Sequence, residues 1–235
     1  MQKPQFRDNY IYHVFNRGVD KRTIFMDGAD YYRFVHQLYE FNNEDRVQNV
    51  RYYFDPETMS VESRPVKRIV SERKKLVDIF VFTLMPNHFH LMLRQRIENG
   101  IVKFMQKLGT GYTMYFNKRY ERTGSLLQGR FKAVMLSRRE HFVYLPYYIH
   151  TNPLSLNYRG STSIDWRMKL DYLTKYRWSS FPDYIGRKNF PSITERAYIL
   201  NVFGGEAEYK QHTASYLKEA SGNGAIESIQ DVKID

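Results

Sequence analysis

The stretch Leu84-Met85-Pro86-Asn87-His88-Phe89-His90-Leu91-Met92-Leu93 decides the fold, because it joins two apolar runs through a Pro-Asn turn. The pattern predicts an antiparallel pair of strands, Leu76 to Leu84 and His88 to Gln95. Side chains two residues apart in a strand point to the same face. His88 and His90 should therefore present both imidazoles on one face. The opposite face of the second strand is apolar and should enter a core: Phe89, Leu91 and Leu93.

Two neighbouring imidazoles on a rigid strand form half of a metal site. A His-x-His pattern is short, however, and two polar side chains on a half-exposed strand are the commoner explanation. His13, on a predicted strand from Tyr10 to Arg17, is a further candidate ligand. A single histidine on a strand is more often a structural hydrogen-bonding residue. The sequence around Tyr148, downstream, is needed to decide between these interpretations.

The composition narrows the class of protein. The chain has 235 residues, of which 42% are hydrophobic, enough for one large domain with a packed core. It has no cysteine, which excludes disulfides, thiolate zinc sites and a cysteine nucleophile. The polar start, Met1 to Asn9, lacks the apolar centre of a secretory signal. No run reaches the roughly 18 apolar residues of a membrane span, and we expect a soluble cytoplasmic protein.

The charge and the aromatic content point to a nucleic acid. The formal net charge is +11, and the chain holds 20 tyrosines beside 16 phenylalanines. A strong positive charge indicates a polyanionic partner. Unpaired bases stack on aromatic rings, so this combination favours single-stranded nucleic acid over an anionic membrane. The competing interpretation is that the tyrosines lie half-buried at the rim of the core.

Two helices are expected around the strand pair. Apolar residues at helical spacing predict one helix from Asp27 or Asp30 to Tyr39 and another from Ile101 to about Tyr120. Between the first helix and the strand pair lies a basic insertion, residues 43–75, with strands predicted over Val50–Phe54 and within Met59–Val70. This insertion is either a solvated hairpin or a basic finger that touches phosphates.

A further strand, Phe131 to Leu136, leads into the helix that carries Tyr148. The segment Ser137-Arg138-Arg139-Glu140 has the form of a capping box, which predicts a helix start. Pro153 disfavours helical geometry in the residue before it, so the helix should end at Thr151 or Asn152. Tyr148 and Asn152 are four residues apart and would share one helical face. Pro146, in the interior, predicts a kink.

The remaining chain predicts mostly irregular and helical structure. An irregular segment should run from Pro153 to about Thr174, followed by a turn at Arg177–Ser180. Two helices are expected near Thr194–Val202 and Glu206–Ala220, and then a frayed polar tail, Ser221–Asp235. We predict an α+β domain over residues 1–185 with a helical C-terminal extension over residues 186–235.

Five short sequence motifs, called blocks here, occur in a fixed order along the chain. Each block alone is weak evidence for a family, but the five together are specific. On these blocks the chain resembles the single-tyrosine HUH transposases, in the REP-associated tyrosine transposase branch of the IS200-like superfamily. Pro146, two residues before the tyrosine, and the long basic insertion are unusual for that family. The blocks, spread over roughly residues 10 to 185, are His13-Val14-Phe15-Asn16-Arg17-Gly18, Met85-Pro86-Asn87-His88-Phe89-His90, Gly124-Ser125-Leu126-Leu127-Gln128-Gly129-Arg130-Phe131-Lys132, Tyr148-Ile149-His150-Thr151-Asn152-Pro153 and Trp178-Ser179-Ser180.

The resemblance implies a fold, a substrate and a set of site residues. The fold would be a ferredoxin-like or RRM-like antiparallel sheet with helices packed on its faces. The substrate would be single-stranded DNA containing a hairpin, cut through a 5′-phosphotyrosine intermediate with Mg²⁺ or Mn²⁺. By motif position, Tyr148 would be the nucleophile and His88, His90 and Asn152 the metal ligands. Tyr147 is a rival nucleophile, but Thr151, not an amide, stands four residues after it.

The DNA contacts and the assembly are less defined by the sequence. Candidate DNA-binding residues are Arg17, Arg130, Lys132 and Arg138, with solvated surface charge as the alternative. The resemblance leaves open a monomer or a homodimer, and a tyrosine supplied by the same or by the partner subunit. A non-catalytic module that stacks single-stranded nucleic acid on an RRM-like sheet is the alternative function. A phosphoesterase with water as nucleophile ranks last, since no carboxylate cluster supports it.

Overall fold

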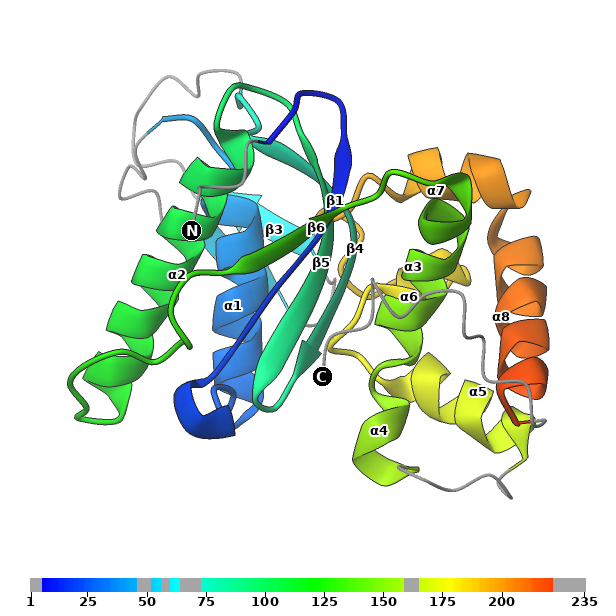
Figure 1. Ribbon diagram of the computed structural model, residues 1–235. Coiled ribbons are helices and arrows are strands. Elements are labelled where there is room, and N and C mark those ends of the chain that lie inside the picture. Colours follow the sequence, from blue (N-terminus) through cyan, green and yellow to red (C-terminus); the bar gives the residue numbers. More distant parts are fainter. Residues whose placement is uncertain (1–5, 46–51, 56–59, 64–72, 159–164, 222–235) are drawn as a thin grey trace.

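The computed structural model describes residues 6–45, 52–55, 60–63, 73–158 and 165–221. A four-stranded antiparallel sheet lies at the centre, with helices on both faces (Figure 1). Its strand order is β4-β5-β1-β6. The strands are β4 (Val77–Met85), β5 (His88–Gln95), β1 (Ile11–Arg17) and β6 (Lys132–Met135). A separate antiparallel pair consists of β2 (Tyr52–Asp55) and β3 (Ser60–Ser63).

The strand pair expected from the sequence is confirmed. β4 and β5 form a hairpin in which Met85 pairs with His88 across the Pro-Asn turn. β4 is buried along its whole length, as its continuous apolar run requires. β5 also pairs with β1, where Phe15 lies opposite His90. The two histidines therefore stand on an interior strand, which holds their backbone rigidly between two neighbours.

The helices α1 (Gly28–Glu40) and α2 (Gly100–Arg119) cover one face of the sheet (Figure 1). Asp27 caps α1 by accepting hydrogen bonds from the backbone of Ala29 and Asp30. Inside α2, a side chain at Gly111 would collide with the Phe41 ring, so this glycine permits close packing of α1 against α2. Both helices agree with the sequence prediction.

The other face carries α3 and the C-terminal helices (Figure 1). Phe80 and Met92 of the sheet, Leu145 of α3 and Tyr209 near the C-terminus share one core. The segment predicted as a C-terminal extension therefore packs directly on the helix that carries Tyr148. These helices are α3 (Arg139–Thr151), α4 (Leu154–Asn157), α5 (Trp166–Lys175), α6 (Phe181–Tyr184), α7 (Arg196–Phe203) and α8 (Glu206–Ser221). A short 3-10 helix, η1 (Val19–Lys21), follows β1 elsewhere in the chain.

Two local predictions were wrong. Helix α5 occupies part of the segment predicted as irregular, with Asp165 as its N-cap. Helix α3 begins at Arg139 without a side-chain cap, so the predicted capping box at Ser137 does not form. The predicted end of the helix is confirmed, since α3 ends at Thr151, but Asn152 keeps helical angles, φ −49° and ψ −39°, although Pro153 follows it. Pro153 is itself helical and leads into α4, which shows that packing outweighed the local preference of a residue before proline.

The helix α3 continues through Pro146, which lies inside its bounds. Proline removes one backbone hydrogen bond from a helix interior. Pro146 is buried, as are its neighbours Leu145 and Tyr147. Burial of this stretch in the second core explains why the helix persists despite the missing bond.

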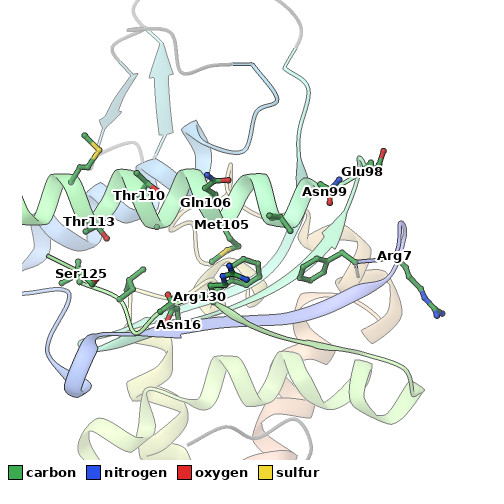
Figure 2. A pocket seen from close by; sticks show the side chains of 18 residues that line it. Arg7, Asn16, Glu98, Asn99, Met105, Gln106, Thr110, Thr113, Ser125 and Arg130 are labelled. Atoms are coloured by element: carbon green, nitrogen blue, oxygen red, sulfur yellow. The ribbon is translucent and has the colours of Figure 1, made fainter. Parts of the chain in front are cut away.

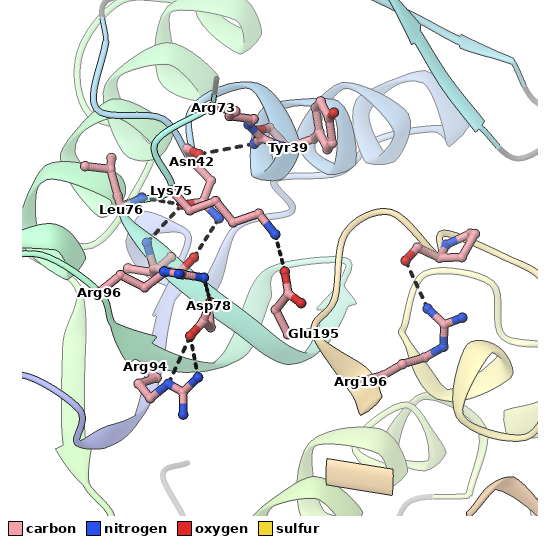
Figure 3. A network of polar contacts seen from close by, with 12 residues as sticks. Tyr39, Asn42, Arg73, Lys75, Leu76, Asp78, Arg94, Arg96, Glu195 and Arg196 are labelled. Carbon is pink, nitrogen blue, oxygen red and sulfur yellow. Dashed lines mark hydrogen bonds and ion pairs between the residues drawn. The ribbon is translucent and has the colours of Figure 1, made fainter. Parts of the chain in front are cut away.

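A polar network ties the edge of the sheet to its surroundings (Figure 3). The buried Asp78 on β4 accepts hydrogen bonds from Arg94 and Arg96, so their charges are neutralised locally. Asn42, after α1, accepts from the backbone of Leu76 and Val77 and thereby fixes the start of β4. These contacts stabilise the end of the sheet remote from the histidines.

The last part of the basic insertion also serves the fold (Figure 3). Arg73 donates to the carbonyls of Tyr39 and Asn42 and lies over the Tyr39 ring, while Lys75 pairs with Glu195. These two cations are engaged inside the protein. The predicted strand over Val50–Phe54 appears as β2, and β3 is the described part of the predicted return strand. Arg64, Lys67 and Arg68 lie outside the described residues.

Among the helices that the structure describes, none has the length and apolar character needed to cross a membrane. The predicted tail after Ser221 lies outside the described residues.

Candidate active site

Three histidines meet on the α3 side of the sheet. The rings of His88 and His90 are perpendicular, with centroids 5.0 Å apart. His13, on β1, reaches His90 from the neighbouring strand, with 2.9 Å between His13 Nε2 and His90 Nδ1. His13 and His90 are buried, whereas His88 is partly exposed at the start of β5. The alternation of strand side chains expected from the sequence thus brings both predicted imidazoles to one face.

The asparagine of the Pro-Asn turn holds the first imidazole. Asn87 Oδ1 lies 2.6 Å from His88 Nδ1. The Asn87 amide nitrogen donates to the carbonyl of Lys21, over 3.1 Å. The turn residue therefore has a direct contact with the site as well as a backbone role.

Helix α3 brings Tyr148 and Asn152 to these imidazoles. Asn152 Oδ1 lies 3.5 Å from His88 Nε2. The Tyr148 ring stands edge-on to both His90 and His13, each with a centroid distance of 5.8 Å. Four of the residues selected from the sequence, from a strand and a helix about 60 positions apart, thus converge in one place.

The surroundings favour neutral imidazoles. Burial lowers the pKa of His90 well below its ordinary value, and the nearby His13 and His88 add to this effect. Burial also lowers the pKa of His88, and the positive charge of Arg17 acts in the same direction, whereas the contact with Asn152 opposes it. Only a neutral imidazole has a nitrogen lone pair to offer a cation. The electrostatics therefore suit a ligand role.

The donor set fits a divalent cation. Two ligands at about 2.1 Å in an octahedral shell are about 3 Å apart, close to the 3.5 Å between His88 Nε2 and Asn152 Oδ1. Imidazole nitrogens favour borderline metals such as Zn²⁺ or Fe²⁺, whereas an amide oxygen suits Mg²⁺ or Mn²⁺. Among the described residues, no group of three or more His, Cys, Asp or Glu side chains is arranged to bind a metal. Asn152 is therefore needed to complete the set.

The rival tyrosines are occupied elsewhere. Tyr147 is buried on the opposite side of α3, stacked on Tyr209 and Tyr216 at centroid distances of 5.2 and 5.7 Å. Its burial raises its pKa. Tyr112, Tyr115 and Tyr120 lie on the α1/α2 face, where their hydroxyls donate to the Ile24 carbonyl or to Asp30. These three tyrosines therefore serve packing and hydrogen bonding on the face of the sheet opposite the histidines.

A positioning contact was missed from the sequence. His150, fully buried, lies on the side of α3 away from Tyr148, with its Nε2 2.8 Å from Ser180 Oγ and its Nδ1 2.7 Å from the Tyr209 hydroxyl. Ser180 Oγ in turn accepts from the backbone of Phe82 on β4. The chain from β4 through Ser180 to His150 sets the position of α3 against the sheet. Both residues belong to blocks noted above, but no spacing rule connects them.

The four candidate DNA-binding residues do not lie together. Arg17 is at the end of β1, paired with His88, and its Nε donates to Gln128. Lys132 lies opposite Phe15 on the edge strand β6, exposed on the histidine side. Arg138 is exposed at the start of α3. Arg17 and Lys132 therefore lie on the histidine side of the sheet, Arg138 lies at the start of α3, and Arg130 lies elsewhere.

Arg130 lines a groove of about 1480 Å³ between α2 and the loop before β6 (Figure 2). Arg7 stands at one end of this groove, and polar side chains of α2, Gln106 and Thr110 among them, line its helical wall. Asn16, which alternates with Arg17 along β1, also borders it. The groove thus opens on the α2 side of the edge strand β6, away from the histidines.

The segment that carries most of this site matches a known protein family. Residues 46–152 match the family model described as transposase IS200 like. The matched segment, a little under half of the chain, includes His88, His90, Tyr148 and Asn152, and ends at the last of them. The match indicates a DNA-processing role connected with transposition.

One solved structure to which this chain is similar is a REP-associated tyrosine transposase bound to a REP hairpin. The two chains are 9% identical, the superposition covers 82% of this chain and 88% of that chain, and the TM-score is 0.46. No curated protein matches the sequence.

Proposed function

We propose that this protein cleaves and rejoins single-stranded, hairpin-containing DNA with Tyr148 as nucleophile and a divalent cation as cofactor. The observation that carries the proposal is the meeting of Tyr148 and Asn152, from α3, with His88 and His90, from β5. A phenol, two neutral imidazoles and an amide oxygen at one point are the groups that this reaction needs.

The proposed reaction exchanges one phosphodiester for another. The Tyr148 oxygen forms a bond to phosphorus while the bond from phosphorus to the 3′ oxygen breaks. The phenol gives its proton to solvent, and the leaving 3′ oxygen takes one up, so the products are a 5′-phosphotyrosine and a free 3′-OH. Because an ester is kept, a later attack by a 3′-OH rejoins the strand and restores the phenol.

His88, His90 and Asn152 would hold the cation, Mg²⁺ or Mn²⁺, and leave positions open for phosphate and water. When bound, the ion polarises the non-bridging oxygens and offsets the charge that develops at phosphorus. The protein itself holds the phenol: Tyr148 packs against His13 and His90 of the same chain, which supports cleavage by the tyrosine of the same subunit. Arg17, paired with His88 across the strands, would attract the phosphate by its positive charge.

The direct test uses DNA hairpins with single-stranded flanks, taken from palindromes near the gene, in Mn²⁺ buffer. A 3′-labelled strand should become attached to the protein and survive denaturation, while a 5′-labelled strand should give a shorter fragment ending in 3′-OH. Tyr148→Phe should abolish the adduct. Tyr147→Phe is the matched control and should retain it, because that hydroxyl is buried away from the imidazoles.

The alternative function, a non-catalytic binding module, gives a different result. It predicts tight, salt-sensitive binding of the same hairpins without any adduct and without a requirement for metal. Cleavage that persists in Tyr148→Phe without a covalent intermediate would instead indicate water as the nucleophile. Either result would overturn the proposal.

A further inference from the structure

We propose that Asn87 and His13 are positioning residues that hold the proton of each candidate ligand histidine on Nδ1, so that both Nε2 lone pairs are free for the cation. This inference rests on the proposed function for its purpose. Its physical content, the location of two protons, can be tested independently of DNA cleavage.

Asn87 determines the tautomer of His88. Its amide nitrogen donates to the Lys21 carbonyl, which fixes the orientation of the amide and turns Oδ1 to His88. An amide oxygen only accepts hydrogen bonds, so at 2.6 Å the proton must be on His88 Nδ1. A neutral imidazole has one N–H, and His88 Nε2 therefore carries the lone pair. That nitrogen is the one that faces Asn152 Oδ1.

His13 plays the same part for His90 from the neighbouring strand. The two buried rings are nearly parallel, at 22°, and share one hydrogen bond between His13 Nε2 and His90 Nδ1. In such a bond one nitrogen donates and the other accepts. If His90 is to bind a cation through Nε2, its Nδ1 must donate and His13 must accept. His13, considered above as a third ligand, is thereby assigned a different role.

These contacts have the form of a general device in metal sites. A ligand histidine usually donates its second N–H to an acceptor, which fixes the ring and raises its basicity, and loss of that acceptor typically costs 10- to 100-fold in metal affinity. The arrangement also gives a chemical reason for the position of Asn87 directly before His88. A turn needs only a residue that tolerates the turn, whereas tautomer control needs a side-chain acceptor.

The first experiment locates the protons in the wild-type full chain. Histidine labelled with ¹⁵N, observed by long-range ¹H–¹⁵N correlation without metal at neutral pH, distinguishes Nδ1–H from Nε2–H. We expect His88 and His90 to carry the proton on Nδ1. A spectrum that shows Nε2–H on His88 would overturn the inference, even if the Tyr148 adduct forms.

The second experiment measures Mn²⁺ affinity by calorimetry, with thermal unfolding to verify the fold. His13→Leu and Asn87→Leu remove an acceptor and should weaken binding 10- to 100-fold. His13→Gln and Asn87→Asp restore an acceptor oxygen and should recover most of the affinity. Loss of packing alone would give no such recovery, so equal losses in the Leu and Gln variants would contradict the role of His13.

The inference and the proposed function can fail separately. If the wild-type chain binds no Mn²⁺ although both protons are on Nδ1, the metal-dependent reaction fails and the tautomer assignment stands. If wild-type protein binds Mn²⁺ and forms the adduct, but His13→Leu and Asn87→Leu bind Mn²⁺ as tightly as it does, the positioning role fails and the reaction stands.

Discussion

The two faces of the central sheet differ in what they do. Along β5, Phe89, Leu91 and Leu93 enter an apolar core beneath α1 and α2. His88 and His90, which alternate with these residues, face α3 and meet polar groups. On the same eight-residue strand, one face is wholly apolar, whereas the other combines the two histidines with Met92, which packs into the second core. Since a shift by one residue would exchange the faces, the apolar face also secures the position of the histidines.

The largest expected effect is a loss of stability caused by a substitution on the apolar face of β5. Phe89 is almost completely buried in the core against Phe34 of α1. Phe89→Ala should lower the free energy of unfolding by about 3–5 kcal/mol, because it removes a large side chain and leaves a cavity. Urea unfolding followed by circular dichroism measures this. A loss below about 1 kcal/mol would show that this face is not the main source of stability.

A substitution at the neighbouring residue, His88, should reduce adduct formation with DNA and leave the free energy of unfolding almost unchanged. His88→Ala removes a candidate ligand that is partly exposed, so we expect adduct formation with hairpin DNA to fall by about 100-fold or more. The free energy of unfolding should change by less than about 1 kcal/mol. Removal of metal with EDTA should reproduce the loss in the wild-type chain. An unchanged adduct yield in both cases would exclude the imidazole as a ligand.

Acid should lower the free energy of unfolding through a buried histidine of α3, His150. Burial lowers the pKa of His150 to about 3 in the folded chain, against about 6.5 unfolded. The unfolded chain therefore binds the proton first, and stability is complete above about pH 6.5 and falls towards pH 3. This group alone should contribute a loss of about 1.4 kcal/mol per pH unit within that window.

His150→Gln tests this assignment, because it removes the titrating ring while an amide can still reach Ser180 or Tyr209. Unfolding in urea at pH 5, 6, 7 and 8 should give a smaller slope in the variant than in wild type. Part of the slope should remain, since the pKa values of His88 and His90 are also lowered. Identical slopes would place the acid-sensitive group elsewhere.

The smallest expected effect is on DNA binding, after a substitution in the groove between α2 and the loop before β6. Arg130→Ala should weaken binding of single-stranded DNA a few-fold and reduce the slope of log K against log salt by about 1, as expected for one phosphate contact. Adduct formation at saturating DNA should not change, because Arg130 lies away from the histidines. Anisotropy titrations at several salt concentrations measure this, with Lys132→Ala as the matched variant on the other face. An unaltered salt slope would exclude Arg130 as a DNA contact.

Local patterns predicted much of this protein. The strand pair, α1, α2 and the helix that carries Tyr148 all follow from the period of apolar residues. The missed α5 also had a signal, since Asp165 caps it and Trp166, Leu170 and Leu173 have helical spacing. The cap predicted at Ser137 fails because the helix begins one residue later than a capping box there requires, after Arg138, whose side chain makes no capping hydrogen bond.

Within the site, the sequence by itself determined which residues could act: two imidazoles on one strand face, and a phenol and an amide on one helix face. It determined this because strand and helix periods are local properties of the backbone. Only the tertiary structure decided what holds them. His13 meets His90 across 77 positions, and His150 meets Ser180 across 30, through strand pairing and helix packing that no local period contains.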